Sequence, residues 1–339
     1  MKIRWAVVAT GGMAYAMVHD MKLVSDAEIK VIVSRTKERA DAAARELGIP
    51  EGSCDYEEVL TRTDIDAVYI ATPHVFHFEQ AKSALNAGKH VLVEKPITMN
   101  AQEARELKKI AVQSGKFLME AMWMVFSPAI IQSLSIAQSG QLGDVTFLHA
   151  NFGVAFDFDS SQVSTSRLWN KELGGSTLLD QGVYPISLAH LLFGKPIESH
   201  VRGDIGETDI DVEASMVLEF ARGERAALSS SMRSHSPLDA SISGNNGFIQ
   251  IESPFWSPPA IRILTRDPRT QRTLSDERIP FIKEGNGYVP MLKEVHLAIH
   301  QGKHEHPLRT LDESIAVMET IDGLIADIRR THAKKNGQR

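Results

Sequence analysis

One lysine in this sequence stands where a charged side chain requires a reason. Lys95 directly follows the apolar run at residues 90–93 and directly precedes Pro96. A lysine at the end of a buried strand can be desolvated, which favours proton transfer, or it can donate a hydrogen bond to a reacting oxygen. Pro96 restricts Lys95 to an extended backbone, and the bond between them is a candidate cis peptide. The competing account is an exposed ion pair of Glu94 with Lys95.

The N-terminal strand leads into a turn that can hold a phosphate group. The apolar run 3–8 gives way to Gly11 and Gly12 and then to a helical stretch. Glycines at such a turn let a pyrophosphate approach the backbone amides at the helix N-terminus. The match to the dinucleotide pattern GxGxxG is partial because Ala9 replaces the first glycine, so an ordinary tight turn is the competing account. The residues expected to bind a dinucleotide here are Ala9, Thr10, Gly11, Gly12 and Met13.

The end of the second strand distinguishes two nicotinamide cofactors. An acidic residue at this point binds the ribose 2′-hydroxyl of NAD and repels a 2′-phosphate. This sequence instead has Ser34, Arg35 and Thr36 after the apolar run 29–33. A hydroxyl and a guanidinium can hold a phosphate, so the sequence predicts NADP as cofactor, with NAD less favoured. The alternative is that Arg35 only caps a solvated helix start.

A third polar group follows the strand predicted at residues 67–71. Thr72 and Pro73 come at its carboxyl end, where open α/β sheets bind their ligands. We expect both residues to lie along the cofactor, with His74 and His77 close by. The two histidines also have the alternative of forming a metal pair, but no nearby cysteine or obvious carboxylate supports it. Histidines that cap or pack the next helix are the favoured account, and no metal is expected.

The order of the predicted elements indicates two domains. In the first part of the chain, apolar strands alternate with helices, which implies right-handed crossovers and a parallel sheet. Strands are expected at 3–8, 29–33, 67–71, 90–93 and 117–120, with helices at 37–47, 77–86 and 101–114. Strands then dominate at 145–154, 214–220, 225–231, 241–243 and 248–251, with helices at 127–139, 176–192 and 310–332. The sequence therefore predicts an α/β Rossmann domain at 1–121 and an α+β domain with a large, mostly antiparallel, open-faced sheet at 122–339.

The composition limits the partners of this protein. The net charge of −6 gives no electrostatic reason to expect nucleic acid or an anionic membrane as a partner. The single cysteine, Cys54, rules out an intramolecular disulfide and agrees with a reducing compartment. No N-terminal signal or long apolar helix is visible, so we expect a cytoplasmic protein. The basic tail at 334–339 is expected to be a frayed end.

Several motifs together resemble a known family. Thr72-Pro73, His77, Ala87-Gly88-Lys89-His90 and Glu94-Lys95-Pro96 are similar to those of the glucose-fructose oxidoreductase and inositol dehydrogenase family, also called Gfo/Idh/MocA. Glu120-Ala121-Met122-Trp123 and the segment 173–186 resemble its branch of dimeric dihydrodiol dehydrogenases and NADP-dependent D-xylose dehydrogenases. The resemblance covers nearly the whole chain.

The resemblance implies a catalytic group made of Lys95, Asp180 and Tyr184. Tyr184 would donate or accept the proton, and Asp180 would orient the substrate hydroxyl. Residues four apart share one helix face, so both can point into a cleft between the domains; a buried tyrosine with a capping aspartate is the alternative. Glu94 and Lys95 would also contact the cofactor, and the second domain would bind substrate and form a homodimer through its open sheet face. Ala9 and Val125 depart from the family's usual glycine and arginine, which puts cofactor affinity and specificity in question.

The expected reaction is hydride transfer between nicotinamide and the CH–OH or C=O group of a sugar, a cyclic diol or a dicarbonyl sugar. Aromatic side chains pack well on the CH faces of such substrates, although core packing is the competing account for each. The candidate substrate-binding residues are Trp123, Phe156, Arg167, Trp169, Asp180 and Tyr184. Two alternatives stay open: a non-catalytic NADP(H)-binding sensor of the same fold, and a metal-dependent hydrolase built on His74 and His77.

Overall fold

The computed structural model describes residues 1–337, with side chains through residue 334. Its contacts divide the chain into two compact units. The first unit combines Met1–Trp123 with Lys283–Ile315, and the second combines Met124–Ile282 with the chain from Ala316 onward. The contacts therefore place residues 283–315 with the first unit, whereas the sequence analysis put them in the second domain. The end of the predicted basic tail, residues 338 and 339, lies outside the described residues.

The first unit is built on a six-stranded parallel sheet in the order β3-β2-β1-β4-β5-β6. Its strands are β1 (Ile3–Val8), β2 (Ala27–Val33), β3 (Glu51–Ser53), β4 (Ala67–Ile70), β5 (His90–Val93) and β6 (Leu118–Glu120). The continuous apolar runs of β1, β4 and β5 are buried, as expected for a parallel sheet covered on both faces. The predicted Rossmann fold is confirmed.

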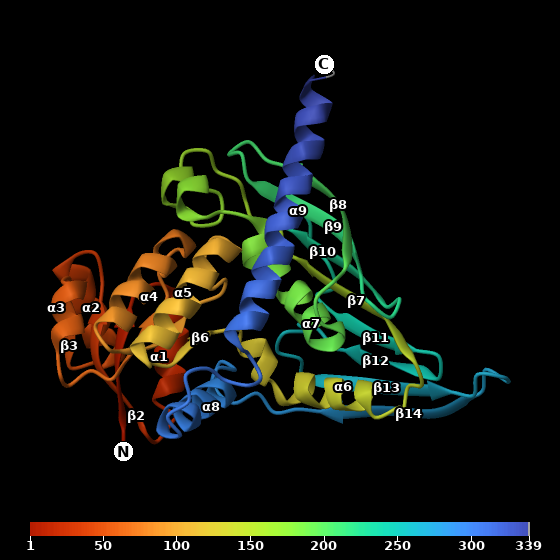
Figure 1. Ribbon diagram of the computed structural model, residues 1–339, viewed down its shortest axis with the longest axis horizontal. Helices are drawn as coiled ribbons and strands as arrows, with labels where there is room; N and C mark the ends of the chain where they lie inside the picture. Colours follow the sequence, from red (N-terminus) through yellow and green to blue (C-terminus); the bar gives the residue numbers. More distant parts are fainter. Residues whose placement is uncertain (338–339) are drawn as a thin grey trace. The chain divides into compact units, whose positions relative to one another are not determined.

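The helices of the first unit are α1 (Gly12–Met21), α2 (Lys37–Leu47), α3 (Tyr56–Thr61), α4 (His77–Asn86), α5 (Ala101–Ser114) and α8 (Val289–His300), and a short 3-10 turn covers His74–Phe76. Helix α8 joins this unit because Asp20 of α1 accepts hydrogen bonds from the backbone amides of Asn286 and Tyr288, at 2.7 and 2.8 Å. These bonds fix the segment that leads into α8, which packs against α1 (Figure 1). No helix within residues 1–337 has the length and apolar character needed to span a membrane.

The second unit contains an eight-stranded sheet in the order β14-β13-β12-β11-β7-β10-β9-β8. Its strands are β7 (Val145–Gly153), β8 (Glu198–Ile205), β9 (Asp211–Glu219), β10 (Arg225–Ser231), β11 (Ala240–Gly244), β12 (Gly247–Ile251), β13 (Ala260–Arg266) and β14 (Thr273–Pro280). Only β7 and β10 pair in parallel within this sheet; the other neighbours are antiparallel. The expected mostly antiparallel sheet is therefore confirmed.

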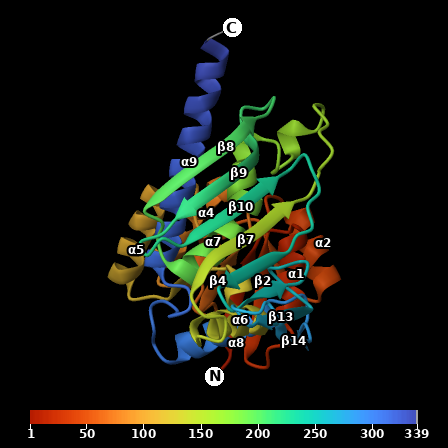
Figure 2. The same cartoon turned by 90° about the vertical axis from the view of Figure 1, so that its right-hand side faces the viewer.

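Helices cover one face of this second sheet. Helix α6 (Pro128–Gln138) packs against β12 and β13, and α7 (Val183–Phe193) packs against β7 and β10. The unit also contains most of α9 (Leu311–Gly337), short 3-10 turns at Val163–Thr165 and Lys171–Leu173, and a π-helical turn, η5 (Leu178–Gly182); a further 3-10 turn, Trp123–Phe126, joins the two units. Among the described residues, no helix covers the opposite face of β7 to β10, which faces the viewer in Figure 2.

Candidate functional site

The turn after β1 has the geometry of a phosphate-binding loop. Ala9 adopts a φ of 136°, a conformation that favours glycine, which explains why the dinucleotide pattern calls for glycine here. Gly11 precedes α1 in an extended conformation, and a Cβ placed at Gly11 or Gly12 would meet nothing within 4 Å beyond its chain neighbours and the backbone of its own helix. The space beside these two glycines at the start of α1 is therefore open. This arrangement fits a pyrophosphate bound at a helix N-terminus.

The end of β2 lies beside this turn. The hydroxyls of Thr10 and Ser34 are 3.1 Å apart, so the turns that follow β1 and β2 meet at their polar side chains. Arg35 is exposed, while the Thr36 hydroxyl accepts a hydrogen bond from the Arg39 amide and caps α2. A hydroxyl and an exposed guanidinium beside the phosphate loop are suited to a ribose 2′-phosphate.

His77 ties together the loops that follow β4 and β5. Its Nδ1 lies 2.8 Å from the carbonyl oxygen of Pro96, and its Nε2 lies 2.8 Å from that of Thr72. Burial lowers the pKa of His77. Because both ring nitrogens face backbone oxygens, neither is available to a metal ion, and the hydrolase alternative loses its support. His74 packs edge-on against the ring of His77.

Lys95 lies in a tethered segment rather than in a surface ion pair. Only 9% of Lys95 and 5% of Glu94 is exposed. The carboxylate of Glu94 accepts hydrogen bonds from the Tyr69 hydroxyl at 2.6 Å and from the Lys95 amide at 3.3 Å. The bond between Lys95 and Pro96, a candidate for the cis form, is cis. The surroundings of this dipeptide therefore contradict the account of an exposed strand-end ion pair.

In the second unit, Asp180 and Tyr184 lie on consecutive helical segments. Asp180 belongs to the π-helical turn η5, and Tyr184 belongs to the first turn of α7. A single helical segment over 176–192 was expected; the structure instead has the π-helical turn η5 followed directly by α7. Arg167, predicted as a substrate-binding residue, donates a hydrogen bond to Asp180 at 3.0 Å. The structure thus brings Arg167 and Asp180 together.

A buried carboxylate supports the turn that carries Asp180. Asp211, at the start of β9, accepts hydrogen bonds from the Ser176 hydroxyl at 2.9 Å and from the Leu178 amide at 2.8 Å. Burial raises the pKa of Asp211 to about 6, although these two hydrogen bonds act in the opposite direction. Local sequence patterns gave no sign of this contact, because Asp211 lies more than 30 residues from the turn.

Two aromatic residues that the sequence analysis did not select pack around Tyr184. The rings of Phe152 and Trp256 stack with centroids 4.0 Å apart and planes 4° apart. The Tyr184 ring lies 5.5 Å from Phe152 and 5.8 Å from Trp256. Phe152 belongs to the same alternating set of β7 as the buried Leu148 and Ala150, so the period of two along this strand was an available signal. Both rings are partly exposed and can offer a face to a ligand.

The other predicted aromatic residues lie in different surroundings. Trp169 is buried in a cluster with Ile210, Val212 and Met232. Trp123 is buried in the first unit, where its ring centroid lies 4.9 Å from that of Tyr288. These positions agree with the competing account of core packing. Phe156, in contrast, is exposed. A substrate contact for any of the three stays a prediction.

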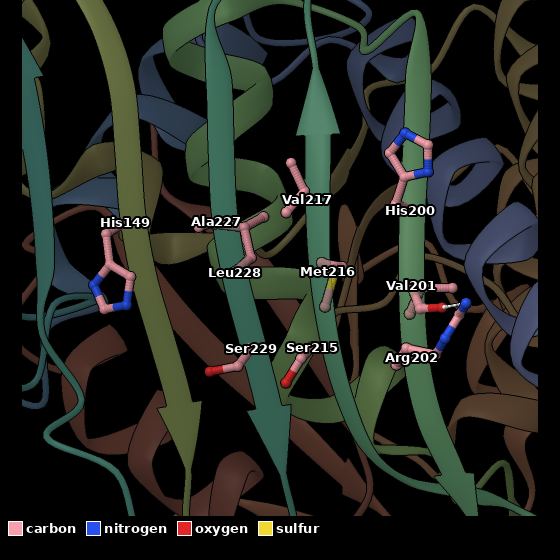
Figure 3. A pocket seen from close by; sticks show the side chains of 10 residues that line it. All are labelled: His149, His200, Val201, Arg202, Ser215, Met216, Val217, Ala227, Leu228 and Ser229. Carbon is pink, nitrogen blue, oxygen red and sulfur yellow. Dashed lines mark hydrogen bonds between the residues drawn. The ribbon is translucent and has the colours of Figure 1, made fainter.

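A hollow on the uncovered face of the second sheet lies apart from all the predicted site residues. It has a volume of about 640 Å³ and is formed by β7, β8, β9 and β10 (Figure 3). Its lining includes small side chains such as Ser215, Ala227 and Ser229, together with His149 and Arg202. The Arg202 guanidinium donates to the carbonyl oxygen of Val201 at 3.0 Å.

Comparisons with known proteins agree over most of the chain. Residues 3–122 match the profile of an oxidoreductase family with an NAD-binding Rossmann fold, and residues 132–250 match the GFO/IDH/MocA C-terminal domain. Trans-1,2-dihydrobenzene-1,2-diol dehydrogenase from Xenopus laevis is 30% identical over 326 residues, which is 95% of this chain and 97% of that protein.

Two solved structures have a similar fold. A 3-ketoreductase from Actinomadura kijaniata, in complex with NADP, is 25% identical, with a TM-score of 0.79 over 96% of this chain and 97% of that one. A levoglucosan dehydrogenase, in complex with NADH and levoglucosan, is 19% identical, with a TM-score of 0.86 over 97% of this chain and 98% of that one. A Rossmann unit with a tethered Glu94-Lys95-Pro96 segment, an antiparallel sheet unit and full-length similarity point the same way: the chain belongs to the Gfo/Idh/MocA family of oxidoreductases.

Proposed function

We propose that this oxidoreductase uses NADP to oxidise a CH–OH group, or to reduce the corresponding C=O group, of a sugar, cyclic diol or dicarbonyl sugar. The observation that carries the proposal is the placement of Lys95. This lysine lies at the carboxyl end of β5, in a buried and tethered segment, within the same sheet whose β1 and β2 turns suit a dinucleotide.

The first unit is the proposed cofactor-binding part. When bound, NADP accepts or supplies the hydride. The amides at the start of α1 would hold the pyrophosphate, and Ser34 and Arg35 would hold the 2′-phosphate. NADP is favoured over NAD because no carboxylate stands at residues 34–36. The related 3-ketoreductase with bound NADP supports this choice, and the levoglucosan dehydrogenase with NADH shows why NAD has to be tested.

We assign the proton transfer to Tyr184 and Lys95. In substrate oxidation, Tyr184 would take the hydroxyl proton as its phenolate while Lys95 donates a hydrogen bond to the reacting oxygen; in carbonyl reduction, the Tyr184 phenol would give this proton to the oxygen. Asp180 would orient the substrate hydroxyl. Its carboxylate already accepts a hydrogen bond from the Arg167 guanidinium at 3.0 Å, which fixes the direction of one carboxylate oxygen.

The aromatic residues around Tyr184 support the proposed substrate class. The stacked Phe152 and Trp256 rings offer flat apolar surface next to a phenol group. Such a surface packs against the CH face of a sugar or the ring of a cyclic diol. The name of the Xenopus laevis relative, a dehydrogenase of trans-1,2-dihydrobenzene-1,2-diol, agrees with this class.

A substrate panel tests the proposal. Purified protein is assayed by nicotinamide absorbance in both directions. Trans-1,2-dihydrobenzene-1,2-diol, D-xylose and D-glucose are offered as reductants with NADP or NAD, and a dicarbonyl sugar is offered as oxidant with NADPH or NADH. Turnover of at least one substrate, with NADP preferred, is expected. Tight NADPH binding without turnover of any substrate would instead identify a non-catalytic sensor.

We also propose that a second copy of this chain covers the open face of the second sheet. A single sheet with one bare face leaves apolar side chains in water, here Phe147 at 39% and Val217 at 36% exposure. The face is lined by small residues, so two copies related by a two-fold axis could pack closely. A cytoplasmic location completes the proposal, because the single, exposed Cys54 suits a reducing compartment.

A further inference from the structure

We propose that Glu120 and Arg309 are positioning residues that hold Lys95 in its working place. The inference rests on the proposed function, in which Lys95 takes part in the reaction. It concerns residues 94–97, called here the strap, and a buried ion pair beneath it. Neither Glu120 nor Arg309 belongs to the predicted catalytic group.

The strap is tethered at four consecutive residues. The Glu94 amide donates to the carbonyl oxygen of Ile70 at 2.9 Å, and the Lys95 amide donates to the Glu94 carboxylate at 3.3 Å. The Pro96 carbonyl oxygen lies 2.8 Å from His77 Nδ1. The Ile97 amide donates to Glu120 Oε1 at 3.0 Å. The hydrogen bond from Ile97 to Glu120 therefore fixes the backbone two residues after Lys95, on the opposite side of Lys95 from the bond made by Glu94.

Glu120 is held in turn by groups from distant parts of the sequence. Its Oε2 accepts hydrogen bonds from Arg309 Nε at 2.9 Å, from Arg309 Nη2, and from the Ser314 hydroxyl at 2.9 Å. Glu120 and Arg309 are each only 1% exposed. One carboxylate thus receives the strap amide on one oxygen and three side-chain donors on the other. Such charge-assisted bonds are short and directional, so the carboxylate cannot turn away from Ile97.

Stability alone does not account for this pair. Burying two charges costs free energy of desolvation, and well-packed apolar residues of similar volume often give equal or greater stability. An apolar side chain at position 120 could fill the same space, but it could not accept the Ile97 amide. The feature that only a polar group at 120 provides is the tether two residues beyond Lys95. A displacement of about 1 Å at a catalytic group can lower turnover about 100-fold, which makes such a tether consequential.

Two double variants separate positioning from stability. Glu120→Gln with Arg309→Met removes the ion pair and keeps a carbonyl oxygen to accept the Ile97 amide. Glu120→Leu with Arg309→Met removes the ion pair and the acceptor together. In the first variant we expect kcat with trans-1,2-dihydrobenzene-1,2-diol and NADP to stay within about threefold of the parent. In the second we expect kcat to fall about 10- to 100-fold, with the KM for NADP changed much less.

Amide hydrogen exchange gives a readout that needs neither substrate nor cofactor. The peptide covering residues 94–99 should exchange about tenfold faster in the Leu/Met variant, because a hydrogen bond to a charged or amide acceptor is lost, and should stay protected in the Gln/Met variant. Equal exchange and equal kcat in the two doubles would overturn the proposal and leave the ion pair a purely structural feature.

Two single variants test the same contact if a double variant does not fold. Arg309→Lys retains the positive charge but loses the paired Nε and Nη2 donors. We expect exchange in residues 94–99 to be modestly faster than in the parent and kcat to fall by at most about threefold, as in the Gln/Met variant, because Glu120 keeps the oxygen that accepts the Ile97 amide and loses only part of its support. Ser314→Ala should act in the same direction but more weakly. Parent-like exchange in both would refute the proposal. If the parent turns over no substrate, the proposed function fails, while the exchange result still decides whether the pair holds the strap.

Discussion

Two buried lysines flank strand β5, and their surroundings assign them different tasks. Lys89 Nζ donates to the carbonyl oxygens of Arg62 and Ile65 at 2.6 and 3.0 Å, so it connects the start of β5 to the preceding loop. Lys95 lies at the other end of the strand, on the ligand-binding edge of a parallel sheet. The same residue type is structural at one end and, in our proposal, catalytic at the other.

Substitution of each lysine by methionine tests this difference. Lys95→Met should lower kcat at least about 100-fold, because the donor to the reacting oxygen is lost, while the protein stays folded. Lys89→Met should lower the free energy of unfolding by about 1–3 kcal/mol and leave kcat within about twofold. Steady-state kinetics and chemical denaturation measure both quantities. Parent-like turnover in Lys95→Met would remove Lys95 from the mechanism.

Ala9 carries backbone strain that glycine would relieve. Its φ of 136° costs a residue with a Cβ about 1–3 kcal/mol in the folded state, and glycine avoids this strain. Glycine also has greater backbone freedom in the unfolded chain, which lowers the free energy of unfolding by about 0.5–1 kcal/mol. We expect Ala9→Gly to raise the free energy of unfolding by about 1 kcal/mol. Ala6→Gly, at a buried alanine of the preceding strand β1, should lower it by a similar amount. A lower free energy of unfolding in Ala9→Gly than in the parent would show that the Ala9 backbone is not strained.

The turn η5 depends on a carboxylate that lies far from it in the sequence. The folded-state pKa of Asp211 is about 6, above its ordinary value of 3.8, so the folded protein binds more protons than the unfolded chain between these values. This contribution to stability is complete below pH 4 and is lost as the pH rises through 6, by about 3 kcal/mol at most. The support of Asp180 should therefore be pH-dependent.

Asp211→Asn should remove this pH dependence. An asparagine keeps one oxygen to accept from Ser176 or Leu178 and carries no charge, so its stability relative to the parent should increase between pH 4 and pH 7. Thermal unfolding at several pH values measures the difference. Asp204→Asn, at an exposed position on the neighbouring β8, should follow the parent. If the unfolding temperatures of the parent and of Asp211→Asn fall equally between pH 4 and pH 7, the raised pKa of Asp211 is contradicted.

For the molecule as a whole, the proposed dimer depends on the uncovered face of β7 to β10. Val217 lies near its centre, opposite Ala227 on one neighbouring strand and His200 on the other. If a second copy packs here, an arginine at this position is buried without a partner and costs several kcal/mol of association free energy.

Val217→Arg should therefore convert the dimer into a monomer. Light scattering after size exclusion should give twice 37.5 kDa for the parent and 37.5 kDa for the variant at micromolar concentration. Val112→Arg, at an exposed valine of α5 in the first unit, is the matched control and should remain dimeric. A monomeric parent, or a dimeric Val217→Arg protein, would contradict the proposed interface.

Much of the first unit could be predicted from local pattern. Apolar strands separated by helices, a glycine turn and the Glu94-Lys95-Pro96 segment have strong periodicity or fixed geometry, and the five strands expected in this unit appear close to their predicted positions. Strands β3, β8, β13 and β14 were missed. β14 carries the run Ser275-Asp276-Glu277-Arg278, which has no apolar face, because an edge strand is buried little by its neighbours. Helix α8 was missed as well, and its segment joins the first unit through Asp20, over 260 residues away.

The sequence by itself determined which reactive side chains are available. These are a lysine directly before a proline, a serine and an arginine at the end of a strand, and an aspartate and a tyrosine four residues apart (Lys95, Ser34, Arg35, Asp180 and Tyr184). The tertiary structure decided which groups support them. Four contacts join residues more than 20 positions apart in the sequence. They are the hydrogen bond from the Ile97 amide to Glu120, the ion pair of Arg309 with Glu120, the hydrogen bond from the Leu178 amide of η5 to Asp211, and the stacking of Phe152 on Trp256. Local periodicity reports only which face of an element is buried, whereas these contacts depend on the packing of elements that are distant in the chain.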